Sequence, residues 1–347
     1  MRLMDILLVF IVITLVLNYI GADSTIIFIS SLLAILPLAA KMGEATEELA
    51  KIYGGHIGGL LNATFGNAAE MIIVLLAINK GLIELVKASL TGSIIGNLLF
   101  VFGVSLFFGG LKFKEQKISK DLSGMNSTML LIAFMSIMIP SLFHFVPAEH
   151  RGNDEQMLSI GVSILLISTY LLSMLFSLKT HSYLFRTKEE HEKPKWSRNR
   201  AILILALSTL FLGAVSEVFV GQIEHVSKNF GITELFMGAI IVALVGNAAE
   251  HMSAVFFALK NKLELSVNVT VGSSLQIAMF VAPVSVLVAT VLGQPMDLVF
   301  SPYEVIAVFA GVLIVNEIVT DGKCNWFEGA QLVIMYLIIA VLFYVVR

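Results

Sequence analysis

GNAAE, the stretch Gly66–Glu70, lies in the middle of a long apolar segment. The same five letters return 180 residues later as Gly246–Glu250, inside a second apolar segment. A charged side chain at the centre of a bilayer costs about 2.5–3.5 kcal/mol on insertion scales, so a carboxylate there is rarely incidental. One Gly/Ala-rich helical stretch alone is more often a packing surface than a binding site. Because Glu70 and Glu250 recur in the same setting, we expect the chain to bring these two carboxylates together.

The composition around these motifs is that of an integral membrane protein. Of the 347 residues, 57% are hydrophobic and 14% are charged, whereas soluble proteins carry about 25% charged residues. Eleven apolar runs approach the length of about 20 residues that a spanning helix needs, near 4–20, 24–43, 57–79, 82–109, 125–146, 157–178, 200–226, 233–259, 262–292, 302–320 and 326–346. The sequence therefore predicts an all-α protein with about eleven transmembrane helices.

Lysine and arginine are shared unequally between the two predicted sides of the membrane. If the N-terminus is inside, seventeen of the 22 basic residues fall on inner loops and five on outer ones. The positive-inside rule then predicts a cytoplasmic N-terminus and an extracytoplasmic C-terminus, which requires an odd number of spans. The first apolar run lacks a small-x-small cleavage pattern, so we expect it to be retained as a transmembrane helix.

Two further motifs indicate an internal repeat. Gly92–Asn97 matches Gly272–Ile277 at the same offset of 180, and Gly43–Glu47 resembles Gly213–Glu217 at an offset of 170. Repeats with an odd number of spans enter the membrane from opposite sides, an arrangement common among secondary transporters. We therefore expect an N-terminal helix (1–23), two inverted-topology repeats of five helices (24–179 and 200–347) and a cytoplasmic linker between them (180–199).

Polar side chains accompany each carboxylate. On a helix, Asn67 shares a face with Glu70, and the small residues between them let another backbone approach. The neighbouring motifs add hydroxyl and amide groups, so that the expected lining comprises Asn67, Asn247, Ser93, Ser273, Asn97 and Gln276. Oxygen ligands without a thiolate suit Ca²⁺, which takes about 6–8 oxygens. Two adjacent carboxylates balance one Ca²⁺ or two protons equally well, and they take up protons as a coupled pair. Glu70 and Glu250 are thus predicted to bind the metal and to exchange it for protons.

Other carboxylates lie nearer the ends of the predicted helices. Glu47 and Glu217 occupy matching positions in the two repeats, which predicts that they line access paths on opposite sides of the membrane. A solvated helix end is the alternative interpretation, and we favour it for Glu44 and Glu48.

His251 follows Glu250 but has no counterpart in the first repeat, where Met71 takes its place. It is either a supporting group or proton relay for the site, or a packed histidine. The second histidine of a zinc-protease helix is missing, so the pair Glu250-His251 does not indicate an enzyme of that kind.

The two copies of Gly-Asn-Ala-x-Glu, each followed by Gly-Ser, resemble the calcium/proton exchanger family of the cation/calcium exchanger superfamily. The resemblance covers residues 24–346 approximately. It implies eleven helices, a broken-helix site at the repeat interface, and Glu70 and Glu250 as the exchanging carboxylates. It further implies a secondary active transporter rather than an enzyme, with Ca²⁺ as its substrate and no cofactor. Many members carry an acidic segment between the halves, and the short, mixed linker here argues against a regulatory role for it. The lack of the long N-terminal extension of many plant and fungal members implies a prokaryotic plasma-membrane protein.

Two other transport functions compete with this interpretation. A sodium/calcium exchanger of the same superfamily typically has a Thr-Ser-x-Pro-Glu-like core, whose hydroxyls bind sodium. A calcium channel generally has symmetry along the membrane normal instead of an inverted repeat. An intramembrane hydrolase is more remote, because we find no pairing of a nucleophile with a base. The expected partners are Ca²⁺, H⁺ and the lipid bilayer, without nucleic acid, and the apolar outer faces permit a homo-oligomer.

Overall fold

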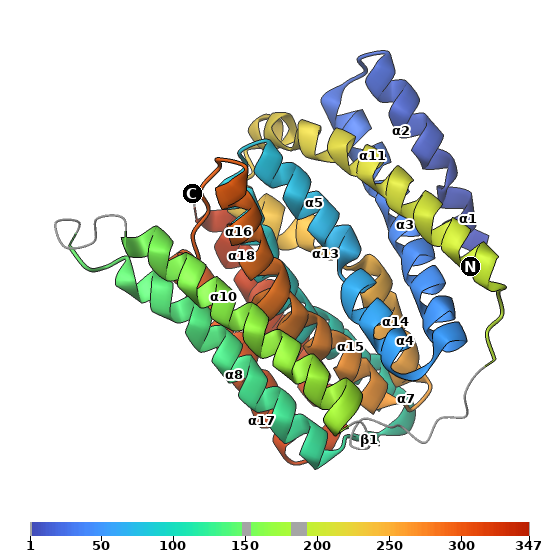
Figure 1. Ribbon diagram of the computed structural model, residues 1–347, viewed down its shortest axis with the longest axis vertical. Helices are drawn as coiled ribbons and strands as arrows, with labels where there is room; N and C mark the ends of the chain where they lie inside the picture. The colour runs from blue at the N-terminus through green and yellow to red at the C-terminus, as the bar shows by residue number, and fades with distance from the viewer. Residues whose placement is uncertain (1, 148–153, 182–192, 347) are drawn as a thin grey trace.

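The computed structural model describes residues 2–147, 154–181 and 193–346, most of which are helical (Figure 1). The first half contains α1 (Arg2–Leu7), α2 (Val9–Tyr19), α3 (Ser24–Tyr53), α4 (Gly55–Phe65), α5 (Ala68–Asn79), α6 (Ile83–Ile95), η1 (Gly96–Val101), α7 (Phe102–Phe113), β1 (Glu115–Lys117), α8 (Lys120–Phe143), α10 (Asp154–Leu175) and η2 (Phe176–Thr180). The second half contains α11 (Arg198–Phe230), α12 (Glu234–Phe236), η4 (Met237–Val242), α13 (Ala243–Gly246), α14 (Ala248–Leu259), α15 (Leu263–Gln276), η5 (Ile277–Val281), α16 (Ala282–Val291), α17 (Pro302–Thr320), β2 (Lys323–Asn325) and α18 (Trp326–Val345). The η labels mark π-helical turns within longer helical spans.

The number of long spans is smaller than the eleven expected. Within the described residues, eight helices are long and apolar enough to cross a membrane, or nine if the bent pair 234–246 and 248–259 is one span. The predicted run 4–20 forms the shorter helices α1 and α2, and the run 57–79 divides into α4 and α5. The apolar composition of a run indicates that it can lie in a membrane, but it does not show where the helix breaks. The expectation of a helical membrane protein is therefore confirmed, whereas the count of eleven transmembrane helices is not.

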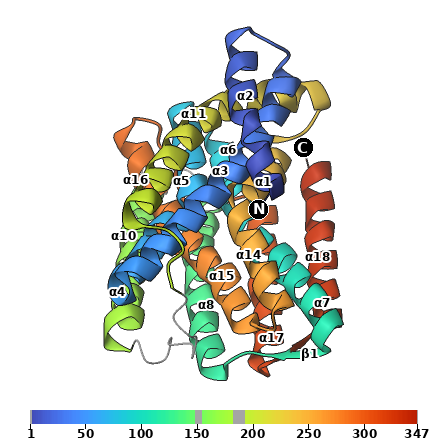
Figure 2. The same ribbon diagram turned by 90° about the vertical axis from the view of Figure 1, so that its right-hand side faces the viewer.

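The longest helices of the two halves, α3 and α11, pack along one another (Figures 1 and 2). Phe28 of α3 stacks on Phe219 of α11, with ring centroids 5.0 Å apart. Asp23 caps the start of α3 through its side chain, and Ser197 does the same for α11. In Figure 1 the helices α5 and α14 lie between this pair and the group formed by α8, α10, α15 and α17. The GNAAE motifs therefore lie inside the helical bundle.

Each GNAAE motif interrupts a helix. Asn67 (φ −98°, ψ 22°) and Asn247 (φ −103°, ψ 11°) leave helical geometry, and α5 and α14 begin at the alanines that follow them. The axis turns by 62° at the second break. A broken helix directs its backbone amides and carbonyls toward the break, which is how many transporters build an ion site inside a membrane.

A short antiparallel pair of strands, β1 and β2, was not anticipated from the sequence. It pairs Gln116 with Cys324, and both side chains are buried. The Gln116 amide donates to the carbonyl of Ala258, 2.9 Å away, near the end of α14. The strands therefore fix the C-terminal end of α14, the helix that carries Glu250 in its first turn.

Candidate cation-binding site

Glu70 and Glu250 lie in the first turns of α5 and α14, respectively. Glu70 is only 1% exposed, and Glu250 is close enough to act on its charge. Gly246 of the second motif lies directly against Glu70: a Cβ on Gly246 would be 3.5 Å from the Cα and Cβ of Glu70. The motifs of the two halves are thus in contact, as the sequence predicted. The positive ends of two helix dipoles favour negative charge at both positions.

The polar residues of the two halves form crossed hydrogen bonds. Ser273 Oγ donates to Asn67 Oδ1 at 2.9 Å, and Asn247 Nδ2 donates to Ser93 Oγ at 2.8 Å. Asn97 Nδ2 also donates to Ser273 Oγ, at 3.0 Å. Each asparagine of a GNAAE motif therefore pairs with the serine from the other half. The site is a joint product of both halves.

Several oxygen atoms in this cluster remain without a donor. Ser93 and Asn247 lie beside Glu70. Among the described residues, however, no hydrogen bond of good geometry reaches Oε1 or Oε2 of Glu70. The buried oxygens without a partner in the cluster are Glu70 Oε1, Glu70 Oε2, Glu250 Oε2, Asn97 Oδ1 and Asn247 Oδ1. Buried polar atoms are normally paired, so a group of unpaired oxygens calls for an occupant. Hard oxygens of this kind match a cation such as Ca²⁺.

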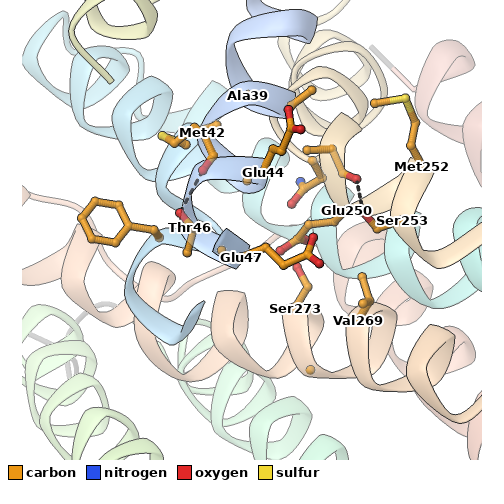
Figure 3. A pocket seen from close by; sticks show the side chains of 18 of the residues that line it. Ala39, Met42, Glu44, Thr46, Glu47, Glu250, Met252, Ser253, Val269 and Ser273 are labelled. Carbon is orange, nitrogen blue, oxygen red and sulfur yellow. Dashed lines mark hydrogen bonds between the residues drawn. The ribbon is translucent and has the colours of Figure 1, made fainter. Parts of the chain in front are cut away.

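A cavity of about 680 Å³ leads to the cluster (Figure 3). Most of its lining comes from α3, α14 and α15, including Glu250 and Ser273, and the side chain of Glu47 is exposed. Gly246 lines the cavity and also packs on Glu70. The cavity therefore reaches Glu250 directly, and Glu70 lies behind Gly246.

Most of the residues predicted for the site lie in or beside this cavity, whereas His251 does not line it and Glu217, predicted for the other side of the membrane, lies elsewhere. Asn67, Ser93 and Asn97 are buried and hydrogen-bonded to Ser273 or Asn247. The cavity is lined by Asn247, Glu250, Ser273, Gln276 and Glu47. His251 is absent from this lining, although the described part of α14 presents its neighbours to the cavity. Glu217 is exposed on α11, where its backbone carbonyl accepts a hydrogen bond from Lys80 at 3.3 Å. It does not share the cavity of Glu47.

The prediction of a solvated helix end was wrong for Glu48. Its side chain is buried, and its carboxylate accepts hydrogen bonds from the backbone amides of Lys195 and Trp196, the latter at 2.8 Å. Asn268, which was not among the predicted site residues, also lines the cavity. Its position four residues before Gly272, hence on the same helical face, was the available signal.

Comparison with known proteins agrees with this architecture. The sodium/calcium exchanger protein family matches residues 23–179 and 200–345. A Ca(2+)/H(+) antiporter of Synechocystis is 44% identical over 98% of this chain and 96% of its own length. The Ca(2+)/H(+) antiporter ChaA of Bacillus subtilis is 45% identical over 92% of each chain.

Solved structures support the same assignment. Native YfkE is 39% identical and superposes with a TM-score of 0.89 over 99% of this chain and 100% of that one. The H+/Ca2+ exchanger CAX, at 14% identity and a TM-score of 0.74, covers 99% of this chain and 92% of its own and shares the fold. One family pattern matches both halves of the chain, and the two bacterial relatives are more than 40% identical over nearly its full length. The chain therefore belongs to the sodium/calcium exchanger protein family, among its calcium/proton antiporters.

Proposed function

We propose that this protein exchanges Ca²⁺ for H⁺ across a membrane by secondary active transport, with Glu70 and Glu250 binding either ion. The names of the bacterial relatives as Ca(2+)/H(+) antiporters support the choice of ions. The observation that carries the proposal is the cluster of unpaired oxygens that both halves contribute around two carboxylates. Ca²⁺ takes about 6–8 oxygen ligands, and the five unpaired oxygens of the cluster would contribute to such a shell.

The charge of the pair explains why the two ions would exchange. Two ionised carboxylates in a water-poor region repel each other, and leaving them unpaired is costly. One Ca²⁺ or two protons neutralise the pair, so that either occupant stabilises the buried site. Protons compete with Ca²⁺ for the same atoms, and calcium affinity is expected to fall as the pH is lowered.

Alternating access would follow from an inverted repeat. The paired broken helices and the paired long helices α3 and α11 support that architecture. With the N-terminus in the cytoplasm, as the basic loops favour, the cavity beside Glu47 would open to the cytoplasm. Exposed apolar side chains such as Leu165 and Leu172 would face lipid or a second copy of the chain.

The purified protein, reconstituted into liposomes, tests the coupling. We expect an imposed pH difference to drive Ca²⁺ against its own gradient in the absence of Na⁺, as measured with a calcium-sensitive dye. The same vesicles with a Na⁺ gradient at uniform pH should show little uptake, because few hydroxyl ligands are available for sodium. Uptake that follows Na⁺ and ignores pH would assign the protein to sodium/calcium exchange.

The access-path glutamates give a second, smaller effect. Glu47→Gln and Glu217→Gln should each raise the calcium KM about two- to fivefold, the scale of an exposed charge, with little change in maximal rate. Glu47 is bridged to Lys51 at 2.7 Å, so its charge is partly screened and its effect should be the smaller of the two.

Glu224→Gln is the matched control for Glu217, because Glu224 is exposed on the same helix and pairs with Lys228 at 3.6 Å. Calcium kinetics in sidedness-controlled vesicles would separate the variants. If neither access-path variant changes the KM more than the control does, both residues are merely solvated helix ends.

A further inference from the structure

Two lysines of α3 lie beside exposed glutamates of the cavity. Glu44 and Glu47 line the cavity (Figure 3), and their side chains are 32% and 62% exposed, respectively. Lys41 Nζ is 3.2 Å from Glu44 Oε2, and Lys51 Nζ is 2.7 Å from Glu47 Oε1. Each of these glutamates is therefore paired with a positive side chain when no metal ion is bound to it.

Each lysine also contacts a second carboxylate. Lys41 Nζ is 3.0 Å from Asp5 Oδ1 on α1, and Lys51 Nζ is 3.4 Å from Glu48 Oε1. In the part of the chain that the structure describes, neither Asp5 nor Glu48 lines the cavity. The other carboxylate oxygen of Glu48 accepts hydrogen bonds from two backbone amides just before α11, which fix its position. A lysine that leaves its cavity glutamate thus keeps a carboxylate partner.

The position of each lysine decides the charge that the cavity presents. Glu44 and Glu47 are three residues apart, hence on one face of α3. With the lysines beside them, their negative charges are largely compensated. With the lysines on Asp5 and Glu48 instead, these outer pairs are neutral, and Glu44 and Glu47 present two negative charges. Two negative charges match one divalent cation.

An ammonium group occupies the corresponding place in the second half, although it comes from a different helix. At the offset of 170, the counterpart of Lys51 is Gly221. A Cβ on Gly221 would be 2.9 Å from Nζ of Lys80, the residue that ends α5, and this Nζ donates to the backbone carbonyl of Glu217 at 3.3 Å. Packing alone could be satisfied by an uncharged side chain, so the recurrence of the positive charge indicates an electrostatic role.

We propose that Lys41 and Lys51 are tethered counter-cations that compete with an entering Ca²⁺ for Glu44 and Glu47, and that they thereby set the apparent calcium affinity of the cavity. Displacing a lysine costs little, because its ammonium group stays paired with the second carboxylate. When Ca²⁺ moves on, the lysine returns, so the entrance does not retain the ion. The inference rests on the proposed passage of Ca²⁺ through this cavity but not on which ion drives it.

Calcium kinetics of charge variants test the competition. Lys51→Met removes the ammonium group and keeps most of the apolar stem, so the calcium KM should fall about two- to fivefold. Glu48→Gln should raise the KM by a similar factor, because the glutamine carbonyl still accepts from the backbone amides while its NH₂ group leaves Lys51 to Glu47 alone. In the other group, Lys41→Met should lower the KM and Asp5→Asn should raise it. A folding defect would move all four variants in the same direction.

The controls separate charge from folding. Lys51→Arg keeps the charge and should keep the wild-type KM. Lys228→Met removes a lysine that pairs with Glu224 at 3.6 Å on α11, and it should leave the KM unchanged. The shifts of the test variants should shrink in choline chloride at about 1 M, where the Debye length is about 3 Å. They should also appear only when Ca²⁺ is supplied from the side on which the cavity opens, as measured with a calcium-sensitive dye in liposomes of one orientation.

A KM that moves in the same direction in Lys51→Met and Glu48→Gln, or shifts that ignore the salt concentration, would overturn the proposal. The outcome is separable from the choice of ions. If the KM shifts appear but uptake follows Na⁺ instead of pH, the role of the lysines stands and the proposed coupling to protons falls. If uptake follows pH but the KM shifts are absent, the coupling stands and the role of the lysines falls.

Discussion

Glu70→Gln is expected to abolish coupled calcium transport, and Glu250→Gln is expected to do the same. Glutamine keeps the volume and one oxygen of the side chain but removes its negative charge and its exchangeable proton. Ca²⁺ would then leave a net positive charge in a buried site, and an uncompensated buried charge costs about 3–5 kcal/mol. Calcium affinity should fall at least about 100-fold for either variant.

The two carboxylates should also fail as a unit. Once one charge is removed, loss of the second has little left to disrupt, so the double variant should be only slightly worse than either single one. Glu→Asp keeps the charge but withdraws it by one methylene, and partial activity is expected. Calcium binding by calorimetry and flux in liposomes would measure both effects.

A matched control is Glu304→Gln. Glu304 is a second buried carboxylate, but it caps α17 through Ser301 and accepts a hydrogen bond from Thr91 at 2.8 Å. This change should affect stability more than calcium affinity. Near-normal proton-coupled transport by a folded Glu70→Gln or Glu250→Gln protein would refute the assigned pair.

Gly92→Ala should disrupt the protein far more than Gly272→Ala, although the two glycines occupy the same position of the repeated motif. A methyl group at Gly92 overlaps the backbone of Ala239, whereas the corresponding methyl group at Gly272 meets no described atom within 4 Å. Forcing α6 away from η4 would cost on the order of 1–3 kcal/mol or more, as in other overpacked interiors. The midpoint of Gly92→Ala should fall by about 5 °C or more.

Gly272→Ala should keep the wild-type midpoint in detergent and still slow transport, because its own contact would form only in the opposite access state. Thermal unfolding followed by size-exclusion chromatography, together with calcium flux, would separate these effects. Equal stability of the two variants would mean that the close contact between Gly92 and Ala239 does not stabilise the packing of α6 against η4.

Much of the site could be predicted from the sequence because each GNAAE motif carries a charge into an apolar segment. The structure brings the motifs that carry Glu70, Glu250, Asn67 and Asn247 into contact, and the role of these residues in ion binding stays a prediction. The count of eleven spans is not confirmed, because the apolar run 57–79 forms two short helices with a break at Asn67. Hydropathy is a property of composition and does not register such a break.

Other features depend on contacts that no local pattern encodes. In the sequence, Glu48 is indistinguishable from other carboxylates near a helix end. Its hydrogen bonds to the backbone amides of Lys195 and Trp196 join residues that are far apart in the chain. Similarly, Gly92 and Gly272 are equivalent in the motif, so the sequence does not show which of the two glycines is packed against a neighbouring helix. A repeated sequence is symmetric, but any one conformation of the protein is not.

The crossed asparagine–serine pairs limit how such a gene can be rearranged. Asn67 needs Ser273, and Asn247 needs Ser93, so neither half encodes a complete set of partners for its own motif. A chimaera that joins the first half of this chain to the second half of a relative inherits one member of each pair from each parent. The second half of a relative can therefore replace this one only if it supplies a serine for Asn67 and an asparagine for Ser93.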